Sequence, residues 1–319
     1  TSDSELPIQK DAVAGIEAVY VVRETGFVQG VRSVANFVNP FSDDFDPVTV
    51  EPYEQVDPAA IDSLVPLLSA SDNDLRESAA NVIGTLRGSA ALPTIQSRLE
   101  EETETDVTLA LIRAIVLIAD REAAKSLIPL TRSSDTDVRA AAIYGLGRLR
   151  VSEAVPQLTD LYSSGIEERR RVLGIPVSSV NEFQRNEFQS LSLIGDPSSK
   201  GLFMDGLSNE ENFYRRFSAE GLGRIGDTSL TTDVARMRIA ERSNEVKLAT
   251  GFALFLLGRE EHLDELVAAA DSGQAKHYLL ELGESDIARL FAYLDSSKPS
   301  IQIALLEVIG LRGGRDAIE

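Results

Sequence analysis

The stretch S-S-D-T-D-V-R-A-A-A-I-Y-G-L-G-R-L-R, residues 133–150, decides the fold of this chain. It opens with small polar residues up to Asp137 and continues with apolar residues spaced three or four apart. This spacing predicts a helix that begins after a polar turn and buries one face. The residues that we expect on the buried face are Val138, Ala142, Leu146 and Leu149.

The same pattern recurs along the chain, and each copy ends at an apolar residue that closes the unit. Successive closing residues lie 32, 31, 45, 31 and 32 positions apart. A period near 31 residues, with room for two helices in each unit, is typical of a helical solenoid. The closing residues are Leu86, Ile118, Leu149, Ile194, Ile225 and Leu257.

The composition agrees with a helical array and excludes several kinds of site. The 319 residues are too many for one compact core, so we expect two domains or an elongated array. Aromatic residues make up 6% and Trp is absent, which suits close helix packing better than a β-sandwich. The chain has no Cys, which excludes disulfides and thiolate metal sites, and it has no apolar run of about 18 residues that could span a membrane.

The net charge of −20 disfavours nucleic acid and anionic membrane surfaces as partners. The acidity fits a salt-loving or GC-rich source as well as it fits ordinary surface charge. Localisation stays open: the cytoplasm is the default expectation, and a leader removed before Thr1 is the alternative.

The chain divides into three parts. Apolar residues at helical spacing from Asp11 to Val38 predict an N-terminal helical cap over residues 1–38, with a frayed start at residues 1–10. Residues 39–57 contain three prolines and many acids, which predicts an extended, acidic connector. Residues 58–319 form the repeat array.

The pattern D-x-D-V-R-x-A-A-x-x-x-L-G-x-L resembles the HEAT-repeat family, in the short form found in bilin-lyase-type HEAT proteins and prokaryotic scaffolds. The resemblance covers roughly residues 58–319, and later units depart from it, with Lys247 and Gln302 at the Arg position. It implies an all-α fold: an α-solenoid, a right-handed superhelix of HEAT-like helical hairpins similar to armadillo arrays. The residues that match in the unit quoted above are Asp137, Val138, Arg139, Ala141, Leu146, Gly147 and Leu149.

Two motifs that suggest chemistry are better explained by the repeat. Residues 221–226 spell G-L-G-R-I-G, but this sequence closes a helix rather than opening one, so we expect helix packing and capping instead of nucleotide binding. The turn aspartates are expected to cap helices and to form a ladder with Arg76 and Arg139. Those aspartates are Asp74, Asp106 and Asp137.

The residue types of the chain give little support for catalysis or for a bound cofactor. His262 and His277 are the two histidines, which is too few for a zinc site of the usual kind. No Cys nucleophile exists and no G-x-S-x-G motif appears. We therefore expect no metal, no cofactor and no enzymatic activity.

The long interval of 45 residues predicts an insertion near residues 163–181. Insertions in solenoids form loops on one face, and such loops often bind partners. Arg169, Arg170 and Arg171 could bind a carboxylate, a phosphate or an acidic partner there. The alternative is a solvated turn or a longer helix in which these arginines pair with nearby glutamates.

A second candidate surface follows from helix geometry. If residues 142, 146 and 149 are buried, position 144 points about 180–200° away from them. In HEAT arrays the second helices line the concave face, so the equivalent residues should form a stripe along it. A mixed aromatic and charged stripe is typical of a groove that binds a protein or peptide. The stripe contains Asn81, Arg113, Tyr144, Glu220, Phe252 and Glu307.

These observations predict a non-catalytic scaffold that binds another protein or peptide, of unknown identity, on its concave face. The alternative, implied by the family resemblance, is a bilin lyase-type HEAT subunit or another HEAT-based enzyme component. That alternative predicts a concave pocket that binds pigment.

Overall fold

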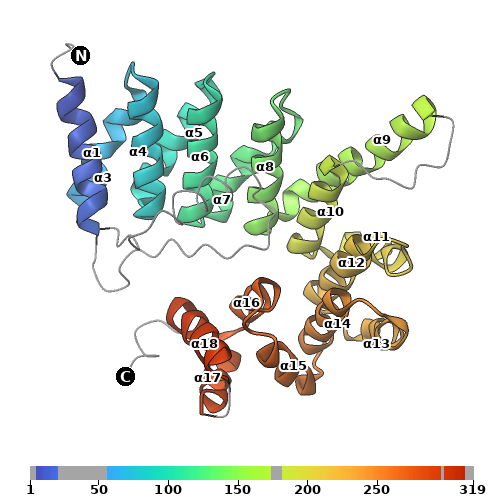
Figure 1. Cartoon of the computed structure of the whole chain (residues 1–319). Coiled ribbons are helices and arrows are strands. Elements are labelled where there is room, and N and C mark those ends of the chain that lie inside the picture. The colour runs from blue at the N-terminus through green and yellow to red at the C-terminus, as the bar shows by residue number, and fades with distance from the viewer. Residues whose placement is uncertain (1–4, 21–55, 174–181, 296–297, 313–319) are drawn as a thin grey trace. The chain divides into compact units, whose positions relative to one another are not determined.

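The computed structural model describes residues 5–20, 56–173, 182–295 and 298–312. Within these ranges every regular element is helical, and the all-α solenoid expected from the sequence is confirmed. Each repeat consists of a first helix, often preceded by a short 3-10 turn, and a second helix that is usually the longer of the two (Figure 1). The chain forms two compact units, and the boundary between them in the sequence falls between Ser190 and Leu191.

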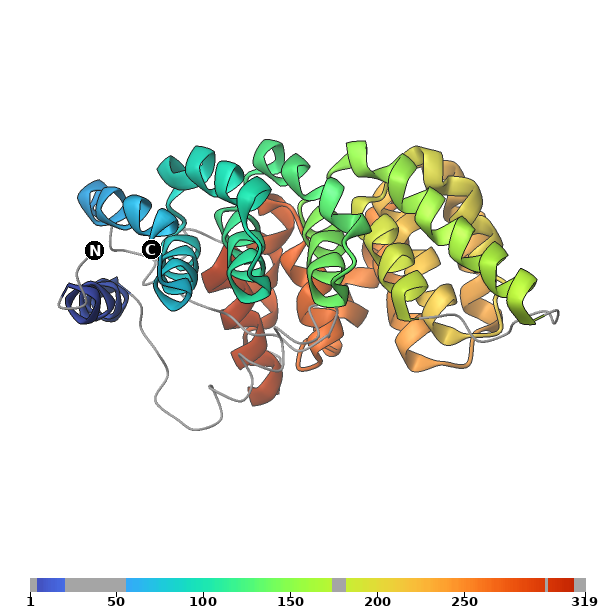
Figure 2. The same cartoon turned by 90° about the horizontal axis from the view of Figure 1, so that it is seen from above.

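The first unit begins with α1 and continues through three complete repeats. Its second helices α4, α6 and α8 pack side by side (Figures 1 and 2). The helices are α1 (Leu6–Tyr20), α3 (Pro58–Leu64), α4 (Asn73–Thr85), α5 (Leu92–Glu101), α6 (Thr105–Ile118), α7 (Arg121–Ala124), α8 (Thr136–Arg148), α9 (Val155–Leu173) and α10 (Glu182–Ile194).

The second unit follows the same plan, and three consecutive helices before its last one are short. Its second helices are α12, α14, α16 and α18, and α12 packs closely against α14. The helices are α11 (Lys200–Gly206), α12 (Asn212–Ile225), α13 (Thr231–Ala240), α14 (Asn244–Leu256), α15 (Leu263–Ala268), α16 (Gly273–Leu280), α17 (Glu284–Leu290) and α18 (Pro299–Arg312).

Glycines bring neighbouring second helices into contact. A Cβ atom added to Gly84 would lie 2.6 Å from the Cα atom of Ala114, and one added to Gly223 would lie 2.6 Å from the Cα atom of Ala253. Such distances are too short for a real side chain, so only glycine fits between these backbones. The glycines of the G-L-G-R-I-G motif are therefore packing and capping residues, as the sequence predicted.

The closing apolar residues end the second helices as expected, and the residue after each has a positive φ. Leu86, for example, is followed by Arg87 with φ 54°, and Ile225 by Gly226 with φ 73°. A left-handed residue at this position ends a helix and satisfies its last carbonyl groups. The residues with this conformation are Arg87, Ala119, Arg150, Gly195, Gly226 and Gly258.

The helix caps lie two positions before those predicted. Asp72 accepts a hydrogen bond from the N–H of Leu75, and Asp135 accepts from those of Asp137 and Val138. Asp74 and Asp137 instead occupy the first turns, where their charges favour the positive end of the helix dipole. The prediction chose the wrong aspartate because either residue of a D-x-D pair is favourable at the start of a helix.

Arg76, one of the two arginines of the predicted ladder, pairs with a glutamate rather than with a turn aspartate. Arg76 donates to both carboxylate oxygens of Glu102, at 2.9 and 3.0 Å, and Arg215 binds Glu241 in the same way at 2.7 and 3.1 Å. Burial works against the charge of Glu102, but the bonds from Arg76 and from backbone N–H groups outweigh it and hold its pKa at about 2. These ion pairs link one repeat to the next.

Helix α1 packs on α4, and it begins earlier than predicted. It starts at Leu6, within the segment expected to fray, because residues 6–20 bury an apolar face that includes Val13. Lys10, in its second turn, binds Asp72 at 3.0 Å and Asp74 at 2.9 Å at the start of α4. The two helices therefore run parallel. Residues 21–55, which hold the rest of the predicted cap and most of the connector, lie outside the described residues.

The predicted insertion at 163–181 is helical over its first half. Helix α9 continues to Leu173, so the longer-helix alternative holds for residues 163–173 and the loop prediction was wrong there. Residues 174–181 lie outside the described residues.

Candidate functional site

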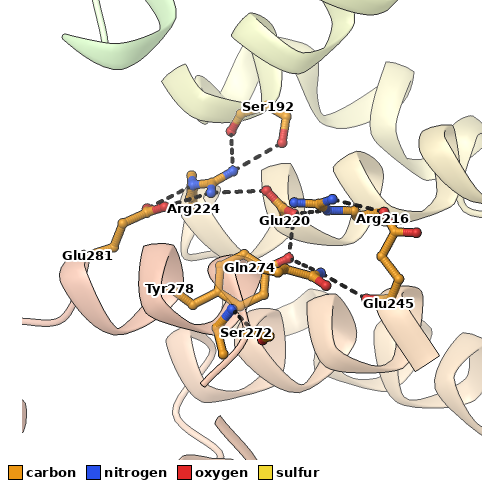
Figure 3. A network of polar contacts seen from close by, with 10 residues as sticks. Ser192, Arg216, Glu220, Arg224, Glu245, Ser272, Gln274, Tyr278 and Glu281 are labelled. Carbon is orange, nitrogen blue, oxygen red and sulfur yellow. Dashed lines mark hydrogen bonds and ion pairs between the residues drawn. The ribbon is translucent and has the colours of Figure 1, made fainter. Parts of the chain in front are cut away.

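A buried polar network joins three second helices of the second unit, α12, α14 and α16 (Figure 3). Its centre is Glu220, whose side chain is 2% exposed. Glu220 accepts hydrogen bonds from Arg216 at 2.9 Å, from Arg224 at 3.1 Å and from the hydroxyl of Tyr278. Two cations and one phenol thus satisfy one carboxylate.

Arg224 is the most completely buried cation of this network. It donates to both oxygens of Glu281, at 2.9 and 2.7 Å, and to the backbone oxygen of Ser192 at 3.1 Å. Burial opposes its charge, but Glu281 and Glu220 outweigh that effect and place its pKa above the usual value. Buried arginines with carboxylate forks on two sides stay ionised and fixed in position.

An aromatic pair covers the network. The rings of Phe252 and Tyr278 stack with their centroids 4.2 Å apart and their planes 4° from parallel. Burial, together with the charge of Glu220, raises the pKa of Tyr278 well above its usual value, so this phenol stays protonated as a hydrogen-bond donor. Gln274 fixes its oxygen from the other side with a bond of 2.7 Å.

Two residues of the predicted stripe, Glu220 and Phe252, belong to this interior. Their exposed fractions are 2% and 0%, so the expectation that they face an open groove was wrong. The prediction assumed that each second helix buries a single face, and it placed Glu220 and Phe252 opposite that face. However, a second helix between two neighbours is covered on more than one side, and Tyr278 of the next repeat lies over Phe252.

Three other residues of the stripe lie one on each second helix of the first unit. Asn81 on α4, Arg113 on α6 and Tyr144 on α8 are all half-buried. The Oδ1 atom of Asn81 is buried and has no hydrogen-bond partner among the described residues. An amide, a cation and a phenol therefore follow one another along neighbouring helices. The sequence identified this row because the repeat register is regular from residue 73 to residue 148.

The arginine run at 169–171 lies in the last turns of α9. The positions of these side chains are outside the described part of the structure. Their role in binding stays a prediction.

A groove of about 610 Å³ lies between α11 and α13 in the second unit. It is lined by both methionines of the chain, the half-buried Met204 and Met237, and by the exposed Arg236 and Arg242. Arg236 pairs with Asp233 at 3.0 Å. The repeat pattern did not predict this groove, because the groove forms between first helices, whose register the pattern determines less well.

Glu187 on α10 is a buried acid that the repeat pattern did not predict. Its residue is 5% exposed, and its Oε2 atom has no hydrogen-bond partner among the described residues. Burial raises its pKa to about 7, although the charge of Arg139 works in the opposite direction. Periodicity missed it because its position is apolar or small in most units.

The described part of the chain contains no evident metal site. The described ranges hold no group of three His, Asp or Glu residues that could bind an ion. In the same ranges no helix is long and apolar enough to cross a membrane.

The family model for HEAT repeats matches residues 96–174, which include Arg113, Tyr144 and the arginine run. Residues 96–174 are HEAT repeats. This confirms the resemblance on which the fold prediction depended.

The bilin biosynthesis protein PecE of Mastigocladus laminosus is 33% identical to the chain over 84 residues. That match covers 26% of this chain and 31% of PecE, so the chain spans about a third of the relative's length. Among solved structures, the complex of CpcE and CpcF of phycocyanin lyase from Nostoc sp. PCC7120 contains a chain that is 20% identical, with a TM-score of 0.47. The match covers 85% of this chain and 98% of that one. An engineered protein is 19% identical over 62% of this chain and 96% of its own, with a TM-score of 0.41.

The likeness to PecE overturns the main functional prediction. The sequence predicted a non-catalytic scaffold and no enzymatic role, whereas the relative is a bilin biosynthesis protein. The finding favours the alternative, a bilin lyase-type HEAT subunit. The scaffold was preferred because the repeat explained each catalytic-looking motif, but a subunit that holds a pigment needs shape and polar groups rather than such motifs.

Proposed function

We propose that this chain is a bilin-binding subunit of a lyase-type enzyme that works with a protein partner. The observation that carries the proposal is the 33% identity over 84 residues to a bilin biosynthesis protein. A bilin is an open-chain tetrapyrrole with a flat conjugated system, two propionates and polar lactam ends. A site for it needs an aromatic or apolar surface, a cation and hydrogen-bonding groups.

The row Asn81, Arg113 and Tyr144 offers these groups in the first unit. Tyr144 would lie against a pyrrole ring, Arg113 would bind a propionate, and the amide of the half-buried Asn81 would form a hydrogen bond with a lactam group. Two of the three residues lie in the segment that matches the HEAT-repeat model. Helices that are fixed by glycine contacts hold the three groups rigidly, which suits a site that must fix the shape of a flexible pigment.

The groove between α11 and α13 is a second place where a bilin could lie. Its lining combines two methionines with arginines, and its volume is that of an ordinary small-molecule site. It lies outside the matched segment, so the row in the first unit is preferred.

The test is a titration of the whole purified chain with biliverdin or phycocyanobilin, followed by absorption and induced circular dichroism. We expect a saturable shift of the long-wavelength band, because a fixed bilin loses its conformational freedom. Arg113→Gln should weaken binding about tenfold to a hundredfold, since a hydrogen bond to a charged group contributes about 1.5–3 kcal/mol. Tyr144→Ala should weaken it as well.

The matched control is Arg242→Gln, which removes an exposed arginine that lines the groove. It should leave the titration unchanged. A weaker titration in this variant alone would move the pigment to the groove. The absence of any saturable spectral change in the unaltered chain would overturn the proposal.

A further inference from the structure

Two first helices, α5 and α13, occupy equivalent places in their repeats and can be aligned residue by residue. Each has ten residues and is followed by a glutamate that binds an arginine 26 positions earlier. These pairs are Glu102 with Arg76 after α5, and Glu241 with Arg215 after α13. Because the ion pairs match, the differences between the two helices show where the second unit departs from the first.

The end of α13 lacks the acidic residues that end α5. Glu100 and Glu101 are exposed on α5. Their counterparts on α13 are Ile239 and Ala240, which are exposed as well. Ile239 is 87% exposed, more than any other large apolar side chain among the described residues. A single exposed apolar residue is common, so its meaning depends on the residues that surround it.

Two arginines take the place of neutral residues near the same helix end. Arg236 corresponds to Ser97, and Arg242 corresponds to Thr103. Arg236 pairs with Asp233 on its own helix at 3.0 Å, and its side chain is 73% exposed. A pair this exposed contributes little, so Arg236 can exchange it for a carboxylate of another molecule. No carboxylate of the described residues forms an ion pair with the exposed Arg242. In a chain with a net charge of −20, this helix end therefore offers two cations to a partner.

The groove between α11 and α13 adds apolar surface beside these arginines. Met237 corresponds to Arg98, which in the first unit binds Glu102 at 3.0 Å. A methionine cannot form that bond, and Met237 instead lines the groove together with Met204 and both arginines. Methionine side chains are unbranched and polarizable, so they adapt to the shape of a partner's side chain. We call Met204, Arg236, Met237, Ile239 and Arg242 the arginine–methionine surface.

We propose that the arginine–methionine surface binds an acidic segment of a partner protein. Carboxylates of the segment bind Arg236 and Arg242, and a large apolar side chain enters the groove between the two methionines. A protein segment fits better than a small molecule because Ile239 is not part of the groove lining, and a ligand that only filled the groove would leave it in water. The inference goes beyond the proposed function and does not depend on whether the first unit binds a bilin.

The test is a fluorescence anisotropy titration of the whole chain against a labelled synthetic peptide of Glu and Leu with an amphipathic pattern. Two further peptides replace every Glu by Gln, or every Leu by Ser. The net charge of −20 repels an acidic peptide from most of the protein surface, so binding is expected only where cations gather. We expect saturable binding of the Glu–Leu peptide and weaker binding of the other two, because the surface needs both carboxylates and an apolar side chain.

Three substitutions of exposed residues should weaken this binding without a change in the fold. Arg236→Gln and Arg242→Gln should each raise the dissociation constant about twofold to fivefold, as expected for exposed charge pairs. Ile239→Glu, which introduces the residue type found at this position of α5, should raise it about tenfold or more, because it removes apolar contact and adds repulsion. The matched control is Arg132→Gln, since Arg132 is also exposed and pairs with Asp160 at 3.1 Å. It should leave peptide binding unchanged.

An unaltered chain that shows no saturable binding of the Glu–Leu peptide would overturn the inference. Equal binding of the Gln–Leu peptide would also contradict it, and so would an equal loss of binding in Arg132→Gln, because either result would exclude recognition of carboxylates by this surface.

The titrations with peptide and with pigment separate this inference from the proposed function. Arg242→Gln should weaken peptide binding and leave the pigment titration unchanged, whereas Arg113→Gln should do the reverse. Displacement of the peptide by biliverdin, together with a weaker pigment titration in Arg242→Gln, would assign the groove to the pigment and overturn the inference.

Discussion

Gly226 and Ala119 occupy the same left-handed position after a second helix, with φ values of 73° and 62°. A side chain in this conformation is strained by about 1–2 kcal/mol, and glycine is not. We therefore expect Gly226→Ala to lower the free energy of unfolding by about 1 kcal/mol, since a Cβ atom there meets nothing within 4 Å and backbone strain acts alone.

The converse change, Ala119→Gly, should raise the free energy of unfolding or leave it unchanged, because relief of strain competes with the greater freedom of glycine in the unfolded chain. Urea unfolding of the two variants measures both effects. A loss of stability in Ala119→Gly that equals the loss in Gly226→Ala would contradict the explanation.

Glu187 should make stability depend on pH. Its pKa is raised by burial to about 7 in the folded chain, from 4.5. The folded chain therefore binds more protons than the unfolded chain between those values, and stability falls as the pH rises from 4.5 to 7, by about 3 kcal/mol as an order of magnitude. The charge of Arg139 lowers the pKa of Glu187, and the value of about 7 already includes this effect.

Glu187→Gln should remove this dependence, because a neutral amide does not titrate. The measurement is urea unfolding of both proteins from pH 4.5 to pH 8. Equal slopes in that window would show that another group is responsible. Glu102 and Glu241, both with a pKa of about 2, act in the opposite sense and below this window: their stabilisation is lost as the pH falls from 4.5 toward 2.

At the scale of the element, the contact between α12 and α14 depends on the absence of a side chain at Gly223. A Cβ atom there would lie 2.6 Å from the backbone of Ala253, so Gly223→Ala must move one helix. We expect a loss of about 1–3 kcal/mol, as for other overpacked interiors. Gly201→Ala, where the added methyl meets open space, is the control and should not destabilise the chain. Equal thermal midpoints for the two variants would contradict the close-packing role.

The sequence predicted where most of the second helices end, but it did not predict which residues their side chains contact. The closing residues gave the ends of six second helices, since an apolar residue followed by a left-handed stop is a local signal. The bond between Arg224 and Glu281 joins residues 57 positions apart, which spans more than one repeat and depends on a shortened unit. Likewise, Asn81, Arg113 and Tyr144 could be found from the register, whereas the burial of Phe252 depended on where Tyr278 would lie.

At the scale of the whole molecule, the two compact units should unfold with different stabilities. Repeats contact chiefly their neighbours, so cooperativity weakens along an array. We expect Glu220→Ala, which leaves buried arginines without their shared carboxylate, to cost about 3–5 kcal/mol and to lower the urea midpoint of the second unit. Hydrogen exchange should then increase in α12 to α16 while α4 to α8 keep their protection. A uniform increase across both sets of helices would show that the chain unfolds as one.

The groove between α11 and α13 can be observed selectively by NMR spectroscopy. The chain contains two methionines and both line that groove, so labelling the methionine methyl carbons with ¹³C yields two NMR signals from one place. Contact with the conjugated pyrrole rings of a bound bilin would shift both signals if the pigment lay there, and would leave them in place if it lay along α4, α6 and α8. The chain has no cysteine, so a fluorophore attached through a single introduced thiol would report on any other surface without background.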